Sequence, residues 1–135
     1  MVCHNSFIYH VGSQSFIRVE NPHELFVKHR KIVIEKWGFD STLYAGMSRN
    51  EYNFIMSLAD KGYTEESHFS LVHVGSGCGN MLGHIHYLYP NADVCGVEEN
   101  EAARNFAISC IPVYPSVEAL PKRLEEYDVV ARGLG

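Results

Sequence analysis

The sequence contains one segment whose residue types and spacing suit ligand binding, the glycine-rich run Gly75 to Asn80 (GSGCGN). It follows a β-prone run that ends at Val74 and precedes a stretch with a helical pattern. Glycine allows a tight turn and lets a ligand approach the backbone closely, and a helix N-terminus presents unpaired N–H groups with a partial positive charge. The segment therefore predicts a binding site that favours an anionic or carboxylate-bearing ligand.

A second β-prone run ends in the acidic pair Glu98 and Glu99, about 20 residues beyond the glycine loop. At this position a carboxylate can accept hydrogen bonds from both hydroxyl groups of a ribose, and Glu98 is the expected ribose ligand. The alternative is that the glycines serve only the packing of a helix on a sheet. The succession of strand, loop, helix, strand and terminal acid favours a nucleoside cofactor over that alternative.

The elements that must position these residues alternate between strand and helix from residue 69 onward. Such alternation implies an α/β fold with a mostly parallel sheet, flanking helices and right-handed crossovers. We expect strands over 69–74, 92–97, 111–114 and 127–131, and helices over 80–89, 101–109 and 117–126.

The N-terminal half has a different pattern. A hairpin is expected over 7–19, followed by an amphipathic helix over 24–37 that Gly38 closes. A second helix is expected after Ser48, because Glu51 stands three residues on in a capping-box pattern. Its buried stripe is expected to consist of Tyr52, Ile55, Met56 and Ala59.

Length and charge limit the possible classes of protein. The chain has 135 residues, of which 46% are hydrophobic, so we expect a single domain over 1–135 with a hairpin and helical cap over 1–66 and a cofactor-binding half over 67–135. The net charge of −5 argues against a surface built for polyanions. Nucleic-acid binding is not excluded, because the stretch 28–36 is locally basic. The acidic residues interleaved with it favour a solvent-exposed helix face instead.

The cysteines and the hydropathy indicate the compartment. The four cysteines show no CxxC spacing and no paired framework, which predicts reduced thiols and a cytoplasmic protein. No apolar run approaches the roughly 20 residues that span a bilayer, so no membrane partner is expected.

The run His73 to Gly79 (HVGSGCG), followed by Val97-Glu98, resembles motifs I and II of the class I S-adenosylmethionine-dependent methyltransferases. The resemblance covers roughly residues 69 to 132. Asn80 stands where a dinucleotide-binding fold would place its third glycine, so the spacing is more similar to methyltransferases than to NAD-dependent dehydrogenases. The resemblance implies a Rossmann-like fold and S-adenosyl-L-methionine as cofactor.

The same resemblance implies roles for individual residues. The glycines would lie against the methionine and ribose portions of the cofactor, Glu98 would bind the ribose and Glu99 would lie near the adenine edge. Ser116 or Glu118 would face the adenine amino group, and Arg132 would lie on the substrate side. His73 stands where the family usually carries an acidic residue near the methionine amino group. The expected cofactor-binding residues are thus His73, Gly75, Ser76, Gly77, Gly79, Glu98, Glu99 and Ser116.

The family fold has seven strands, and this sequence stops after the fourth, so the sheet is expected to be incomplete. The strand 127–131 would then lie at an edge and pair with a second copy or another chain, with Val129 and Val130 buried on opposite faces. The function expected is methyl transfer to an unidentified nucleophile, with no assignable catalytic residue. The alternative is a non-catalytic nucleoside-binding or regulatory module that pairs with another chain.

Three other features of the sequence carry a weaker prediction of chemistry. His84 and His86 form an H-x-H pair on an expected helix, where a spacing of two favours surface residues over a metal site, and no metal is predicted. Cys78 is next to an expected helix N-terminus that can lower a thiol pKa, but a small loop residue is the favoured reading. Three aromatic residues, Trp37, Phe39 and Tyr44, could cap a ligand pocket, but aromatic residues that flank helices more often belong to the core.

Overall fold

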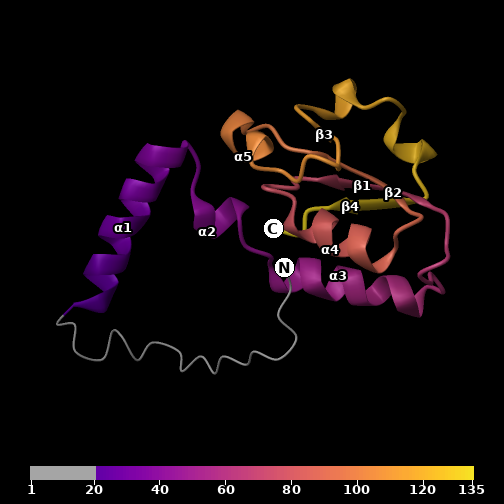
Figure 1. Cartoon of the computed structure of the whole chain (residues 1–135), viewed down its shortest axis with the longest axis horizontal. Coiled ribbons are helices and arrows are strands. Elements are labelled where there is room, and N and C mark those ends of the chain that lie inside the picture. The colour runs from indigo at the N-terminus through magenta and orange to yellow at the C-terminus, as the bar shows by residue number, and fades with distance from the viewer. Residues whose placement is uncertain (1–20) are drawn as a thin grey trace, which may run out of the picture.

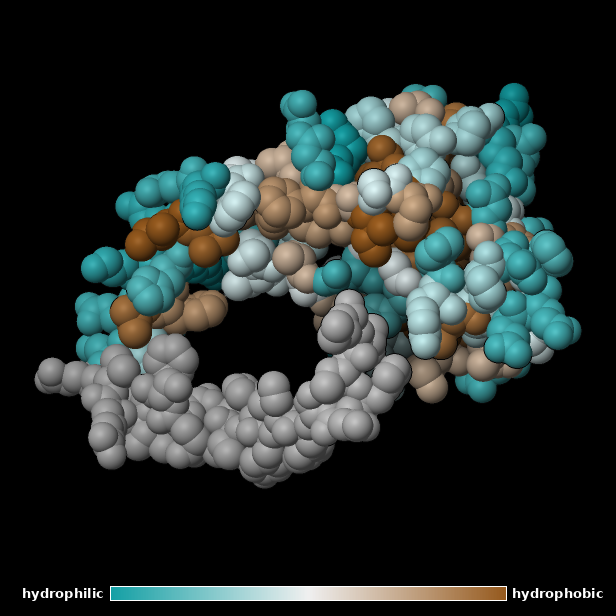
Figure 2. All heavy atoms as spheres, viewed as in Figure 1, coloured by the Kyte–Doolittle hydropathy of each residue, from teal (hydrophilic) through white to brown (hydrophobic). Residues whose placement is uncertain are grey.

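The computed structural model describes residues 21–135, and the hairpin expected over 7–19 lies outside them. Helix α1 (Pro22–Trp37) ends at Gly38, whose φ of 80° is left-handed and whose N–H donates to the Ile34 carbonyl. This confirms the expected helix and its glycine cap. The helix has no buried residue and extends away from the sheet (Figure 1), and polar and apolar side chains are mixed on its surface (Figure 2).

Two helices link α1 to the sheet, α2 (Ser41–Tyr44) and α3 (Arg49–Asp60). The capping box of α3 is confirmed, because the Ser48 hydroxyl accepts the Glu51 N–H and the Glu51 carboxylate accepts the Ser48 N–H. The predicted buried stripe is wrong in part, since α3 turns a different side toward the sheet. Ile55 and Leu58 are the buried residues, whereas Tyr52, Met56 and Ala59 are exposed.

A four-stranded parallel sheet forms the centre of the structure, in the order β3-β2-β1-β4. This confirms the α/β, Rossmann-like fold with flanking helices. The central strand β1 pairs with β2 on one side and with β4 on the other, so β4 is an edge strand within the described part of the chain. The strands are β1 (Ser70–Val74), β2 (Asp93–Val97), β3 (Val113–Tyr114) and β4 (Val129–Arg132).

The crossover segments differ from each other. Helix α4 (Asn80–Leu88) agrees with the prediction, whereas α5 (Glu101–Asn105) is shorter than the expected 101–109. The helix expected over 117–126 is wrong, because two 3₁₀ turns, η2 (Val117–Ala119) and η3 (Leu124–Glu126), take its place. Pro121 explains the break, since a proline lacks the N–H donor and forces the preceding residue, Leu120, into the extended conformation it adopts here.

The sheet is covered differently on its two faces (Figure 1). Helices α3 and α4 cover one face, where Leu71, Val129 and Ala131 join the larger core. The 3₁₀ turns and Tyr127 cover the other face and pack on Val72 and Cys95. Val130 points to this second face and is 38% exposed, so its expected burial is wrong.

A helix that crosses a membrane must be both long and apolar. Across residues 21–135, none of the helices combines the length and apolar character needed to cross a bilayer.

Candidate functional site

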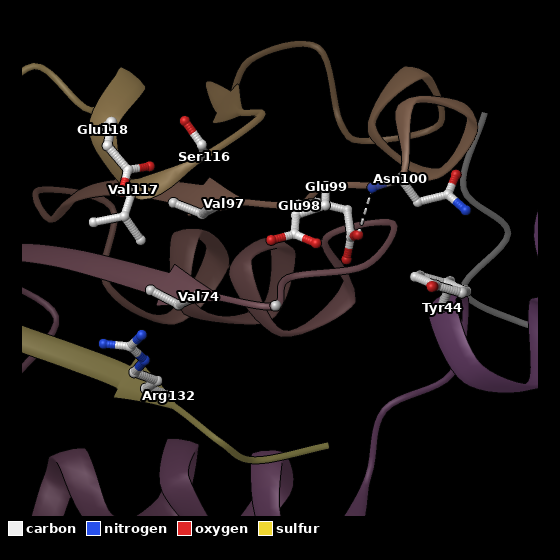
Figure 3. Close-up of a pocket in the computed structure, with 11 residues that line it drawn as sticks. Tyr44, Val74, Val97, Glu98, Glu99, Asn100, Ser116, Val117, Glu118 and Arg132 are labelled. Carbon is white, nitrogen blue, oxygen red and sulfur yellow. Dashed lines mark hydrogen bonds between the residues drawn. The ribbon is translucent and has the colours of Figure 1, made fainter.

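The carboxyl ends of three strands meet at one edge of the sheet. The chain proceeds from β1 through β2 to β3 in one direction and then returns to β4 on the other side of β1. Ligands of open α/β sheets bind at such a reversal of strand order. A hollow of about 460 Å³ lies at this edge, and Val74, Val97 and Arg132 line it from β1, β2 and β4 (Figure 3).

The loop after β1 requires its glycines. Gly75, Gly77 and Gly79 have φ values of 84°, 57° and 84°, in the left-handed region that other residues rarely adopt. The expectation that glycines allow a tight turn here is confirmed. The turn brings the loop back against the end of β2.

The N–H groups of the loop are already used within the protein. Those of Gly75 and Ser76 donate to the Val97 carbonyl over 2.8 and 3.0 Å, and that of Gly79 donates to Ser76 over 2.9 Å. The Cys78 N–H donates to the Tyr44 carbonyl over 2.8 Å. The Gly77 N–H donates over 3.0 Å to the side chain of Glu98. The N–H groups of residues 75–79 are therefore not free to bind an anion.

Glu98 is a buried carboxylate at the end of β2, with 7% of the residue exposed. Its Oε1 accepts the Gly77 N–H. Its Oε2 accepts the Asn100 N–H over 2.9 Å (Figure 3). Each carboxylate oxygen has two lone pairs, so each retains capacity for a further donor. Glu98 therefore fixes the loop and still presents acceptors to the hollow that it lines.

The hollow is acidic. Glu98, Glu99 and Glu118 contribute three carboxylates to its lining, and Arg132 contributes one guanidinium. Opposite charges attract more strongly in a partly enclosed site than in bulk water. The lining therefore favours a neutral or cationic ligand over a diphosphate.

A second hollow of about 260 Å³ lies on the other side of the loop. Ser76 and Gly77 line it from the loop and Glu51 lines it from the first turn of α3. Gly75 and Tyr44 line both hollows. An elongated ligand that passes Gly75 could therefore occupy both spaces.

The Tyr44 backbone fills the space beside Gly77. A β-carbon on Gly77 would stand 2.5 Å from the Tyr44 oxygen. The Asn80 side chain holds the same segment by donating to the Ala45 carbonyl. The glycine at 77 thus makes room for the protein's own chain, whereas a β-carbon on Gly75 would meet open space.

The three aromatic residues Trp37, Phe39 and Tyr44 do not all lie in the same environment. Phe39 is buried and packs edge-on against Phe106, which Trp37 also contacts at 5.2 Å between ring centroids. Only Tyr44 lines the hollows, so the core interpretation holds for Phe39 and the pocket-capping one fits Tyr44.

His73 lies in the interior of the protein, with 1% of the residue exposed. Its Nε2 is 3.6 Å from Glu51 Oε1, and its Nδ1 has no hydrogen-bond partner among the described residues. Burial lowers the pKa of His73, although Glu51 and Glu98 oppose that effect. His73 and Gly79 line neither hollow, so the structure does not place them beside a ligand there.

The remaining expected residues gather around the two hollows. Gly75, Glu98, Glu99, Ser116 and Arg132 line the larger one, and Ser76 and Gly77 line the smaller. Sequence reasoning missed Asn100, although it directly follows the acidic pair. It identified Glu51 only as a capping residue, because no local pattern relates α3 to the loop.

Other reactive side chains show no sign of a site. Burial, with a smaller effect of Glu98, raises the pKa of the Cys78 thiol, so the idea of an activated cysteine is not supported. His84 and His86 are both exposed. Nowhere in the part of the chain that the structure describes do three potential metal ligands cluster.

Comparison with solved structures finds a sugar N-methyltransferase, KedS8, from a Streptoalloteichus species. The two chains are 20% identical and superimpose with a TM-score of 0.44 over 96% of this chain. This chain spans 44% of the length of that protein. No protein-family model and no curated protein matches the sequence.

Proposed function

We propose that this chain binds S-adenosyl-L-methionine at the carboxyl edge of the sheet and is a methyltransferase, or part of one, that acts on an unidentified nucleophile. The placement of Glu98 carries the proposal. Its buried carboxylate ends β2, touches the glycine loop and lines the larger hollow with acceptor capacity to spare. A carboxylate at this position can accept hydrogen bonds from the hydroxyls of a ribose, which supports the proposal.

Two observations favour this cofactor over NAD. The N–H groups of residues 75–79 donate to protein acceptors, so the loop cannot cradle a diphosphate with them. The lining of the larger hollow has three carboxylates and one guanidinium, which disfavours two phosphate charges but suits a sulfonium cation. A ligand that is a nucleoside with a cationic or neutral extension satisfies both conditions.

The two hollows suggest how such a ligand would lie. We place the ribose on Glu98 and the adenine along Glu99, Ser116 and Glu118, all of which line the larger hollow. The methionine portion would pass Gly75, which has no side chain to obstruct it, into the smaller hollow. Tyr44, which lines both spaces, would flank the cofactor at the passage between them.

The chemical demands on the protein are modest. When bound, S-adenosyl-L-methionine supplies a methyl group that is already activated by the sulfonium. The protein then has to hold donor and acceptor in line and exclude water. We propose that Arg132, which ends β4 and lines the larger hollow, orients the substrate.

A second candidate function is a nucleoside-binding or regulatory module without catalysis that pairs with another chain. The position of β4 favours it. Within residues 21–135 this strand pairs with β1 alone, and an edge strand of this kind can pair with a strand of another chain.

Calorimetry with S-adenosylmethionine, S-adenosylhomocysteine and NAD tests the cofactor. We expect both sulfur-containing ligands to bind more tightly than NAD. Tighter binding of NAD, or no binding of either sulfur-containing ligand, would contradict the proposal. Transfer of a labelled methyl group to a panel of small amines, hydroxyl compounds and RNA then separates an enzyme from a binding module.

A further inference from the structure

We infer that Glu51 is the residue that binds the ammonium group of the cofactor's amino-acid end, in the smaller hollow. The inference rests on the proposed function and names a contact that the glycine loop and Glu98 do not supply. It follows from the position, partners and charge of this side chain.

Among the described residues, only one oxygen of the Glu51 carboxylate accepts a hydrogen bond. Its Oε2 accepts the Ser48 N–H over 2.6 Å as part of the capping box of α3. Its Oε1 is 3.6 Å from His73 Nε2, which is beyond hydrogen-bond distance. The side chain is 12% exposed and lines the smaller hollow. One oxygen is therefore oriented by the helix cap while the other keeps acceptor capacity.

Within residues 21–135, this carboxylate has no lysine or arginine partner. Glu51 is the only side chain charged at neutral pH among those that line the smaller hollow. Among the described residues, His73 is the only basic group within 4 Å of this carboxylate, and burial, which lowers the pKa of His73, favours its neutral imidazole. A partly buried carboxylate without a cation is costly, and an ammonium ligand would relieve that cost.

The connection between the hollows determines which ligand brings the ammonium. Gly75 lines both spaces, and nothing lies within 4 Å of the point where its β-carbon would stand. A nucleoside seated on Glu98 can therefore extend its 5′ substituent past Gly75 toward Glu51. In S-adenosylmethionine and S-adenosylhomocysteine this substituent ends in an amino acid, whose ammonium is the complement of the Glu51 carboxylate.

The test combines a variant with a matched pair of ligands. Glu51→Gln removes the charge but keeps the helix cap, because glutamine serves at this position of a capping box as glutamate does. Glu101→Gln is the control, since it removes an exposed carboxylate from the first turn of α5 that lines neither hollow. The ligands are S-adenosylhomocysteine, which has no sulfonium charge, and its desamino analogue, which keeps the carboxylate but lacks the ammonium.

We expect the wild-type chain to bind S-adenosylhomocysteine about tenfold to a hundredfold more tightly than the desamino analogue, in line with a charge-assisted hydrogen bond. Glu51→Gln should lose most of that preference by weakening only the first ligand, and Glu101→Gln should keep it. An unchanged preference in Glu51→Gln, or an equal loss of both ligands, would overturn the inference while the proposed function stands. If the wild-type chain bound neither ligand, the proposed function itself would fail.

Discussion

The carbonyl oxygen of Tyr44 accepts the Cys78 N–H over 2.8 Å and stands 2.5 Å from the point that a β-carbon on Gly77 would occupy. The end of α2 and the glycine loop are thus fitted together through their backbones. Because Tyr44 lines both hollows, this contact determines the shape of the candidate site. A change at Gly77 should therefore act on the protein's own packing before it acts on a ligand.

The contact between Tyr44 and Gly77 can be tested with a pair of alanine substitutions. Gly77→Ala imposes a left-handed backbone on a residue with a side chain and forces the Tyr44 backbone to move. Strain and overpacking together should lower the free energy of unfolding by about 2 to 4 kcal/mol. Urea denaturation measures the loss.

Gly75→Ala is the matched control for that variant, because Gly75 has a similarly positive φ but open space at its β-carbon. It should lose only the strain contribution, about 1 to 2 kcal/mol. Equal losses in the two variants would show that the Tyr44 backbone moves aside at little cost.

The role of Glu98 can be separated from its structural contacts by comparing ligands within each variant. Wild-type protein should bind adenosine more tightly than 2′,3′-dideoxyadenosine by about 1 to 3 kcal/mol, since the second ligand lacks both hydroxyls. In Glu98→Ala that difference should vanish, even though the variant also loses the acceptors of the Gly77 and Asn100 N–H groups. A preference that persists in the variant would place the ribose elsewhere.

The ion pair between Arg30 and Asp40 should make the attachment of α1 sensitive to acid. The hydrogen bond from Arg30, with a further one from Thr42, lowers the pKa of Asp40 from 3.8 to about 2. A carboxyl whose pKa is lower in the folded protein contributes stability above its unfolded pKa and loses it as the pH falls through the folded value. The contribution should therefore be complete above about pH 5 and disappear toward pH 2.

Trp37 provides the measurement, because it is the only tryptophan of the chain, lies at the end of the helix that carries Arg30, and packs against Phe106. Its fluorescence in urea titrations between pH 5 and pH 2 should show a loss of stability that is smaller in Asp40→Asn. Asp128, whose pKa is also lowered, by hydrogen bonds from Ser70, is unchanged in both proteins and cancels in the comparison. If wild type and Asp40→Asn showed the same pH dependence, Asp40 would not be the source of the loss of stability in acid.

The edge strand β4 should mediate self-association or the binding of a partner strand. Val130 is 38% exposed on this strand, so a charge can be introduced there with little effect on the core. Val130→Lys should shift a dimer toward monomer, because a lysine on an edge strand opposes strand pairing, whereas Val130→Thr should behave as wild type. Sedimentation at micromolar concentrations measures the change, and a wild-type chain that stays monomeric there would argue against β4 as an interface.

Much of the fold was predictable because its signals are local. The cap of α3 depends on Ser48 and Glu51, three residues apart, and the end of α1 depends on Gly38. The parallel sheet followed from the alternation of strand and helix patterns. The prediction is wrong at the segment 117–126, because Pro121 interrupts a helix there.

The candidate site divides in the same way. The sequence alone determined that a glycine loop follows β1 and that an acid ends β2, because backbone conformation and the ends of strands depend mainly on residues that are neighbours in the sequence. It could not determine that the loop donors would be used internally, since Tyr44 reaches Cys78 only through the path of the folded chain. Glu51 comes to lie beside His73 for the same reason, because α3 meets β1 through packing between residues that share no local pattern. Local chemistry is fixed by sequence, whereas the contacts that give this site its charge and shape form only when distant segments bury their apolar surfaces together.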